Sequence, residues 1–157
     1  MKKRIIKIVL VTLSLLWIVF IFSNSLEDSV ESGAKSSWAL EIARKIFPSI
    51  SEFFIRKFAH FTEFAILGFL FSASISSFIY PIAITESKKL LWIFLALPTT
   101  FLTACFDEFL QNFSEGRHPA FTDVLIDTSG GLFAILISVA EIWGVIVLLT
   151  KCSKKAY

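Results

Sequence analysis

The apolar residues of this chain fall in four long blocks that are separated by polar segments. The blocks cover about residues 5–22, 58–80, 90–110 and 121–149. A helix needs about 20 mostly apolar residues to cross the hydrocarbon layer of a membrane, and each block is close to that length. The blocks lack the alternation of apolar and polar residues that is typical of membrane β-strands. The pattern therefore predicts an all-α protein built as a four-helix transmembrane bundle.

The composition agrees with a membrane protein. Hydrophobic residues make up 55% of the chain and charged residues 18%, and the mean hydropathy is +0.75. Soluble domains have about 45–50% apolar and about 25% charged residues, so this chain departs from them in both respects. Its 157 residues predict a single domain, residues 1–157. The net charge of only +2 gives no sign of a nucleic-acid partner, and we expect none.

Lysine and arginine residues predict the orientation of the four expected spans. With a cytoplasmic N-terminus, the inner side holds nine of them, Lys2, Lys3, Arg4, Lys7, Lys88, Lys89, Lys151, Lys154 and Lys155. The outer side then holds six, Lys35, Arg44, Lys45, Arg56, Lys57 and Arg117. Because positive charge accumulates on the cytoplasmic side, we expect a multi-pass protein of the cell membrane with both termini in the cytoplasm. The first block is longer than a usual signal-peptide core, which favours an uncleaved span.

The longest polar segment, residues 23–52, separates the first two blocks. Within it, Ser36 or Ser37 is a candidate cap for a helix that Pro48 ends. Three apolar residues recur there at every fourth position, Trp38, Ile42 and Ile46. This spacing predicts a short amphipathic helix in the first extracytoplasmic loop, lying on the outer membrane surface. The alternative is a lid that packs on the bundle, and both interpretations place the helix over the mouth of the bundle.

Charged residues open the second block. Arg56, His60 and Glu63 share an arc of about 60° on a helix, with Lys57 beside them. A single histidine would more often be a structural hydrogen-bonding partner, here for Glu63. Three ionisable groups on one face of a lipid-embedded helix favour a functional role, because such groups are costly in hydrocarbon. Below them the small residues Gly68, Ser72 and Ser76 recur at every fourth position, a pattern that lets membrane helices approach closely.

A second polar stretch, residues 107–127, connects the third and fourth blocks. Its charged and amide residues include Asp107, Glu108, Gln111, Arg117, Asp123 and Asp127. On the fourth block an arc of about 80° holds residues that are all small or polar, namely Asp123, Asp127, Gly130, Ala134, Ser138 and Glu141. That face should point into the bundle. We therefore expect the two polar stretches to form one site at the outer end of the helices.

Three motifs carry a resemblance to a known family. They are RKxAHFxEFAILG from Arg56, DExxQxFxxGR from Asp107 and DVLIDxxG from Asp123, and the earlier FSNS at Phe22 is a looser fourth element. Together, over about residues 20–135, they resemble the VanZ-like family, named for a membrane protein associated with resistance to the glycopeptide teicoplanin. The resemblance implies four spans and an envelope-facing role, but no particular reaction. One departure is Asp127, where the family usually has asparagine.

The crowded carboxylates of the expected site need a cation or shared protons to lie together, so a divalent cation is a candidate cofactor. The candidate catalytic residues are His60, Glu63, Asp107, Glu108 and Asp123. The candidate ligand-binding residues are Arg56, Lys57, Gln111, Arg117 and Asp127. Arg117 follows Gly116 in a turn, where it would either join Asp107, Glu108 or Asp123 or hold an anionic ligand.

Three functions fit these residues. The first is an enzyme that modifies a lipid headgroup or a lipid-linked wall intermediate, with His60 and a carboxylate as acid and base. The second is a non-catalytic protein that binds or masks an envelope ligand, with a glycopeptide or lipopeptide antibiotic as a further candidate partner. The third is a small oligomeric lipid transporter. Binding or modification at the outer leaflet is favoured over transport, because the polar face ends near Ser138; the sequence does not separate the first two.

Overall fold

The computed structural model describes residues 2–79 and 93–155, and every element in these two ranges is helical. The elements are α1 (Lys2–Ser25), α2 (Ser29–Arg44), α3 (Glu52–Ile79), α5 (Ala96–Leu110), the short 3-10 helix η1 (Gln111–Phe113) and α6 (Phe121–Lys155). The expectation of an all-α protein is confirmed. The predicted start of the third block, residues 90–92, and the last residue of the second block lie outside the described residues.

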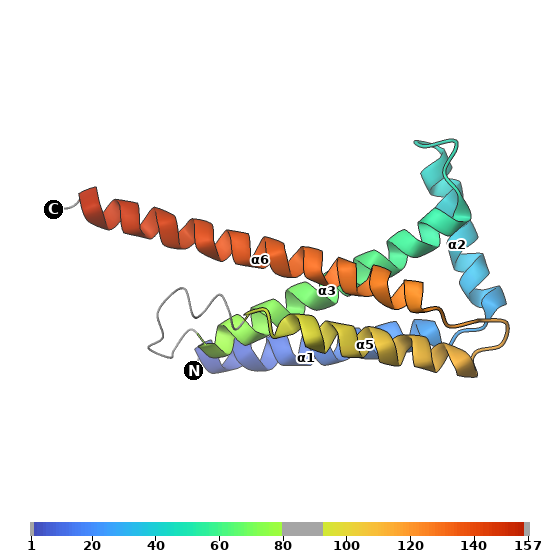
Figure 1. Ribbon diagram of the computed structural model, residues 1–157, viewed down its shortest axis with the longest axis horizontal. Coiled ribbons are helices and arrows are strands. Elements are labelled where there is room, and N and C mark those ends of the chain that lie inside the picture. Colours follow the sequence, from blue (N-terminus) through green and yellow to red (C-terminus); the bar gives the residue numbers. More distant parts are fainter. Residues whose placement is uncertain (1, 80–92, 156–157) are drawn as a thin grey trace.

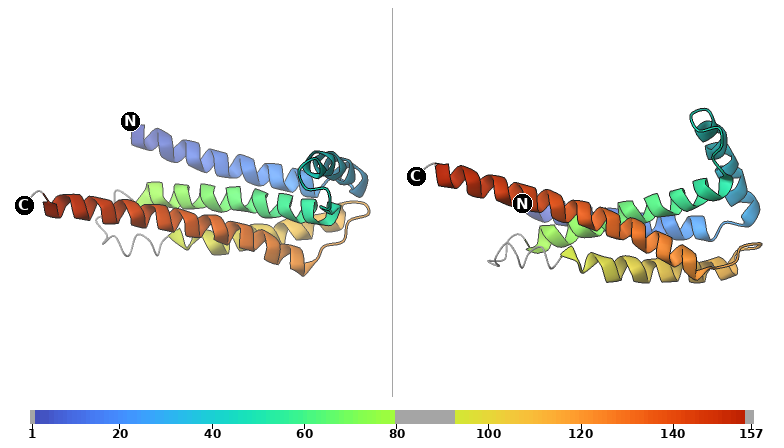
Figure 2. Two further views of the ribbon diagram at one scale, coloured as in Figure 1. Left: turned by 90° about the horizontal axis from the view of Figure 1, so that it is seen from above. Right: turned by 45° about the horizontal axis from the view of Figure 1, so that its top comes forward.

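Four of these helices, α1, α3, α5 and α6, run lengthwise beside one another (Figure 1). Helix α3 has the central place, because it packs on α1, on α5 and most extensively on α6. Seen from above, α3 lies between α1 and α6 (Figure 2). Helix α2 lies steeply across one end of this group, whereas α1 begins and α6 ends at the opposite end (Figure 1).

Three of the described helices are long and apolar enough to cross a membrane, Lys3–Ser25, Glu52–Ile79 and Phe121–Gly144. Their outer surfaces are apolar as well. In α1, for example, Leu15, Leu16 and Val19 are each about 60% exposed. An apolar surface of this extent is unfavourable in water and suits a lipid solvent. The chain therefore has the features of a membrane protein.

Glycine residues bring α3 and α6 into close contact. A Cβ atom on Gly68 of α3 would lie 2.6 Å from the carbonyl oxygen of Gly131 in α6, and a Cβ on Gly130 would overlap the carbonyl oxygen of Phe61. Further along the same faces, Ser72 is buried, and so are Ala134 and Ser138. The small-residue faces predicted for these two helices are thus confirmed, and they set the depth at which the polar ends of the helices meet.

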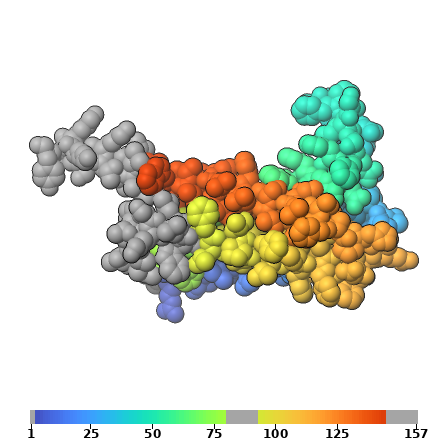
Figure 3. All heavy atoms as spheres, viewed as in Figure 1, coloured from blue at the N-terminus to red at the C-terminus, as the bar shows by residue number. Residues whose placement is uncertain are grey.

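Helix α2 begins earlier than predicted, and neither Ser36 nor Ser37 caps it. The carboxylate of Asp28 accepts hydrogen bonds of 2.8 Å from the backbone N–H groups of Val30 and Glu31, which is the usual role of an N-cap aspartate. Leu40 is buried against the rest of the chain, whereas Trp38 is 68% exposed and does not pack on it. The end of α2 and the start of α3 project from the packed helices (Figure 3).

Candidate functional site

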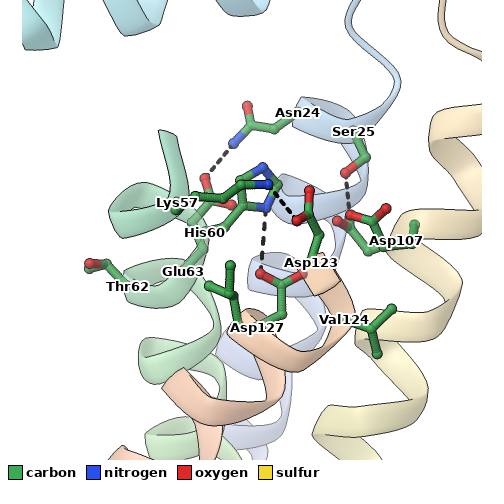
Figure 4. A network of polar contacts seen from close by, with 12 residues as sticks. Asn24, Ser25, Lys57, His60, Thr62, Glu63, Asp107, Asp123, Val124 and Asp127 are labelled. Carbon is green, nitrogen blue, oxygen red and sulfur yellow. Dashed lines mark hydrogen bonds and ion pairs between the residues drawn. The ribbon is translucent and has the colours of Figure 1, made fainter. Parts of the chain in front are cut away.

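The two polar stretches meet at the end of the structure that α2 covers. The N-terminal turns of α3 and α6, the C-terminal turns of α1 and α5, and the connection between α5 and α6 all contribute side chains there (Figures 1 and 4). The glycine contacts between α3 and α6 hold the N-terminal turns of these two helices together. The apolar side chains directly beneath them form a buried cluster, Ile21, Phe64, Leu67, Ala104 and Val124.

Two aspartates are completely buried in this region, Asp107 and Asp127. Asp107 Oδ1 accepts a hydrogen bond of 2.5 Å from Ser25 Oγ, whereas its Oδ2 has no hydrogen-bond partner. Neither carboxylate oxygen of Asp127 has a hydrogen-bond partner, and Oδ1 lies 3.6 Å from His60 Nδ1 (Figure 4). One ligand atom from each of His60, Asp107 and Asp127 lies within 4.8 Å of the other two. These are the residues of the site that could hold a metal ion.

Two other acidic residues of the site have partners on neighbouring helices. Lys57 of α3 forms an ion pair with Asp123 of α6, and both side chains are mostly buried. Glu63 Oε1 accepts a hydrogen bond of 2.9 Å from Asn24 Nδ2 of α1. The charges of Lys57 and Asp123 are therefore engaged with each other, while Glu63 connects α3 to the end of α1.

Glu108 and Gln111 lie at the end of α5, where they shape the connection to α6. Glu108 Oε1 accepts a hydrogen bond of 2.8 Å from Gln111 Nε2, and Glu108 Oε2 accepts one of 2.8 Å from the backbone N–H of Ala120. Both residues are buried. Glu108 thus holds the loop just before α6 begins, so its two oxygens are occupied by structural contacts.

Arg117 binds the end of α1. Its Nη1 donates hydrogen bonds of 2.9 and 3.1 Å to the carbonyl oxygens of Asn24 and Ser25, and its Nη2 donates one of 3.1 Å to Ser32 Oγ. Gly116 has φ 71°, a left-handed conformation that turns the chain so that the guanidinium reaches α1. Of the two expectations for Arg117, a structural role is supported, but its partners are two helix-end carbonyls and a serine hydroxyl, not the predicted carboxylates.

A cavity of about 140 Å³ lies beside this network, between α1, α2 and α3. Its polar lining residues are Asn24, Lys35, Arg56, His60, Glu63 and Arg117, together with Glu27, Ser32 and Ser36. Lys35 forms an ion pair with Glu27. Arg56 is exposed, and among the described residues no hydrogen bond or ion pair is recorded for its side chain. The guanidinium of Arg56 is therefore available to bind a ligand in the cavity.

The chain matches the family model described as VanZ/LLP1 over residues 8–144. The chain belongs to the VanZ/LLP1 family. A search of curated proteins and a search of solved structures found no match. The range shared with the VanZ/LLP1 family includes the whole polar end of the molecule, so the buried aspartates and the cavity both lie within the family domain.

Sequence reasoning placed most of the residues of this VanZ/LLP1 site at one end, but it missed several partners. Ser25 and Asn24 were noted only as a loose motif after the first span, although they bind Asp107 and Glu63. Trp17 of α1 also donates a hydrogen bond of 2.9 Å to the backbone carbonyl of Glu63 in α3. The sequence did hold a signal for Ser25 and Asn24, because both are polar residues at the outer end of the first span, the same end at which the carboxylates were expected. Nothing in the sequence pattern singles out Trp17.

Proposed function

We propose that this VanZ/LLP1 protein crosses the cell membrane four times and presents its polar end outside the cytoplasm. Helix α5 is the third of the four spans in chain order in this proposal, and residues 80–92, which precede it, lie outside the described part. Both termini are cytoplasmic, which accords with α1 beginning and α6 ending at the same end (Figure 1) and with the distribution of lysine and arginine. The exposed Trp38 and Ile42 of α2 then face the outer membrane surface.

The proposed function is to bind the anionic headgroup of a membrane lipid or of a lipid-linked wall component in the cavity between α1, α2 and α3. The observation that carries this proposal is Arg56, which lines the cavity with no recorded hydrogen bond or ion pair in the part of the chain that the structure describes. The other cations near it are engaged, Lys57 by Asp123 and Lys35 by Glu27. A guanidinium can hold a phosphate through two parallel hydrogen bonds, which suits such a headgroup.

An apolar surface beside the cavity suits the hydrocarbon part of such a ligand. The connection between α2 and α3 forms an open apolar pocket of about 670 Å³, and Ile46, Phe47 and Phe54 are among its lining residues. All three side chains are more than half exposed. Phe54 of this pocket precedes Ile55 and Arg56, which line the polar cavity. An acyl or prenyl chain in the apolar pocket would thus lie close to a headgroup in the cavity.

Binding of this kind explains the association that the family resemblance implies. A wall component held at the outer surface is shielded from a glycopeptide such as teicoplanin, and a lipopeptide antibiotic would be affected in the same way. Modification of the headgroup is a second candidate, favoured by His60 and Glu63, which line the same cavity and offer an acid and a base. No specific contact among the described residues favours transport by an oligomer.

The test is lipid binding to the detergent-purified protein, measured by native mass spectrometry. Phosphatidylglycerol and a polyprenyl phosphate are the anionic probes, and phosphatidylcholine is the reference lipid. Arg56→Gln should weaken binding of the anionic probes at least about tenfold, because a charge-assisted hydrogen bond contributes roughly 1.5–3 kcal/mol. Phosphatidylcholine binding should change little.

The matched control is Lys45→Gln. Lys45 is exposed at the end of α2 and does not line the cavity, yet its replacement removes the same charge from the same end of the molecule. It should leave all three affinities near those of the unmodified protein. Equal losses in Arg56→Gln and Lys45→Gln, or no loss in either, would contradict a headgroup site at Arg56. A modified headgroup that forms with the unmodified protein and not with His60→Ala would identify an enzyme, and the absence of any modified headgroup with the unmodified protein would identify a binder.

A further inference from the structure

Asp107 and Asp127 form a buried acidic pair beneath the polar surface. Both side chains are completely buried, and three of their four carboxylate oxygens have no hydrogen-bond partner. The fourth accepts the hydrogen bond from Ser25. Buried polar groups are normally hydrogen-bonded, and a buried charge without a partner is strongly unfavourable. This pair therefore needs a positively charged partner or a shared proton.

The described basic side chains around the pair are engaged elsewhere. Lys57 forms its ion pair with Asp123, and Arg117 donates its hydrogen bonds to α1 and α2. The neighbour that faces the pair is His60, whose Nδ1 lies 3.6 Å from Asp127 Oδ1 and has no hydrogen-bond partner of its own (Figure 4). An imidazole nitrogen and two carboxylates thus point their unpaired atoms at one another.

We propose that His60, Asp107 and Asp127 bind one divalent metal ion of the first transition row, with Zn²⁺ as the preferred ion. Their ligand atoms lie within 4.8 Å of one another. Tetrahedral Zn²⁺ with bonds of about 2.0–2.2 Å places its ligand atoms about 3.3–3.6 Å apart, so the His60–Asp127 distance of 3.6 Å already fits. Two carboxylates and a neutral imidazole also match the charge of a divalent ion.

The donor set decides the class of metal. Ca²⁺ and Mg²⁺ prefer sites made of oxygen atoms, whereas an imidazole nitrogen favours Zn²⁺ and its first-row neighbours. Three protein ligands leave a coordination position for water or for an atom of a bound ligand, as in zinc sites that are not purely structural. The Ser25 hydroxyl fits the second layer of such a site, because it holds Asp107 by one oxygen and leaves the other free.

The site goes beyond the proposed headgroup binding, since it can be tested with no lipid present. The protein is purified in detergent through a histidine-free tag, stripped with a chelator, exposed to Zn²⁺ and dialysed, and its metal content is measured by mass spectrometry. About one Zn²⁺ per chain is expected, together with a higher apparent melting temperature in Zn²⁺ than in chelator. Less than about a tenth of an ion per chain would overturn the proposal and leave a shared proton as the partner of the pair.

Matched variants locate the ion. His60→Gln and Asp127→Asn should each lower Zn²⁺ content at least tenfold and abolish the effect of Zn²⁺ on melting. His118→Gln replaces the chain's other histidine, which is exposed, and Asp123→Asn replaces a carboxylate one turn from Asp127 that is paired with Lys57; both should keep the ion. If the two control variants lose as much Zn²⁺ as the first two, or if the first two keep it, the ion binds elsewhere and the proposal is wrong. The Zn²⁺ content of the unmodified chain decides the question even where one variant fails to fold.

Discussion

Replacing Arg117 by lysine should destabilise the protein, although the charge is kept. The guanidinium joins three groups on two other elements, the carbonyls of Asn24 and Ser25 at the end of α1 and the hydroxyl of Ser32 in α2. A lysine ammonium is a compact point charge and does not reproduce this planar set of donors. Arg117→Lys should therefore keep one contact and lose the other two, which loosens α1 and α2 at the mouth of the cavity.

The size of the effect follows from the partners that remain. A hydrogen bond to a charged group contributes about 1.5–3 kcal/mol, and its loss costs more when it leaves a buried partner unpaired. In the variant the Ser25 carbonyl still accepts a hydrogen bond of 2.7 Å from Ser114 Oγ, and the Asn24 carbonyl still accepts a hydrogen bond from the backbone N–H of Glu27. Two lost contacts at the lower end of the range amount to about 3 kcal/mol, and the favourable charge at the C-terminus of α1, about 0.3–1 kcal/mol, persists. We expect a loss of about 2 kcal/mol, or about 4–8 °C in melting temperature for a chain of this length.

The assay is thermal unfolding in detergent, followed by tryptophan fluorescence, with Arg56→Lys as the control. Arg56 lies at the same end with no recorded hydrogen bond in the described part, so its replacement should shift melting by less than about 1 °C. Adding Glu108→Gln to Arg117→Lys should not restore stability, because Arg117 binds carbonyls and not that carboxylate. Equal melting of Arg117→Lys and the unmodified protein, or rescue by the second substitution, would refute the reasoning.

Three further predictions concern packing, topology and the metal. Gly130→Ala should lower the melting temperature by a few degrees, because overpacking against α3 costs about 1–3 kcal/mol, whereas Gly144→Ala, in the same helix but with nothing within 4 Å, should keep or raise it. A cysteine at the exposed Glu115 should react with a membrane-impermeant maleimide in intact cells. Labelling only after lysis would show that the polar end faces the cytoplasm and that the proposed topology is wrong. Ser25→Ala should weaken Zn²⁺ binding about 10- to 100-fold, measured by competition with a chromophoric chelator; an unchanged affinity would remove Ser25 from the site.

The helices were the most predictable part of the fold. Runs of apolar residues place α1, α3 and α6, but α3 begins at Glu52, several residues before the predicted start at 58. The Ser51 hydroxyl accepts a hydrogen bond from the backbone N–H of Phe54 and starts the helix in polar sequence, which a search for apolar blocks does not detect. The same kind of capping, by Asp28, explains why the predicted start of α2 at Ser36 or Ser37 was wrong.

For the site, the rule that ionisable groups avoid lipid was sufficient to predict that the two polar stretches, with His60, Asp107 and Asp127 among their residues, lie at one end of the helices. The individual partners were not predictable. They depend on the rotation of each helix, which the contacts of Gly68 and Gly130 set between α3 and α6, and on the path of the loop. A helical wheel orders residues on one helix only, so it gave no means of pairing a residue with the carbonyls of another.

His60 connects the two proposals, because it lines the cavity and also faces the buried aspartates. Without a cation, two ionised aspartates would place negative charge behind the cavity and repel an anionic headgroup; with a divalent ion bound, that charge is balanced. Headgroup and metal would then strengthen each other's binding, and this coupling has to be equal in both directions. Arg56 is no metal ligand and His60 is one, so the two residues separate the effects. A substitution at Arg56 should weaken headgroup binding while the metal stays bound. A substitution at His60 should remove the metal and should therefore also weaken headgroup binding.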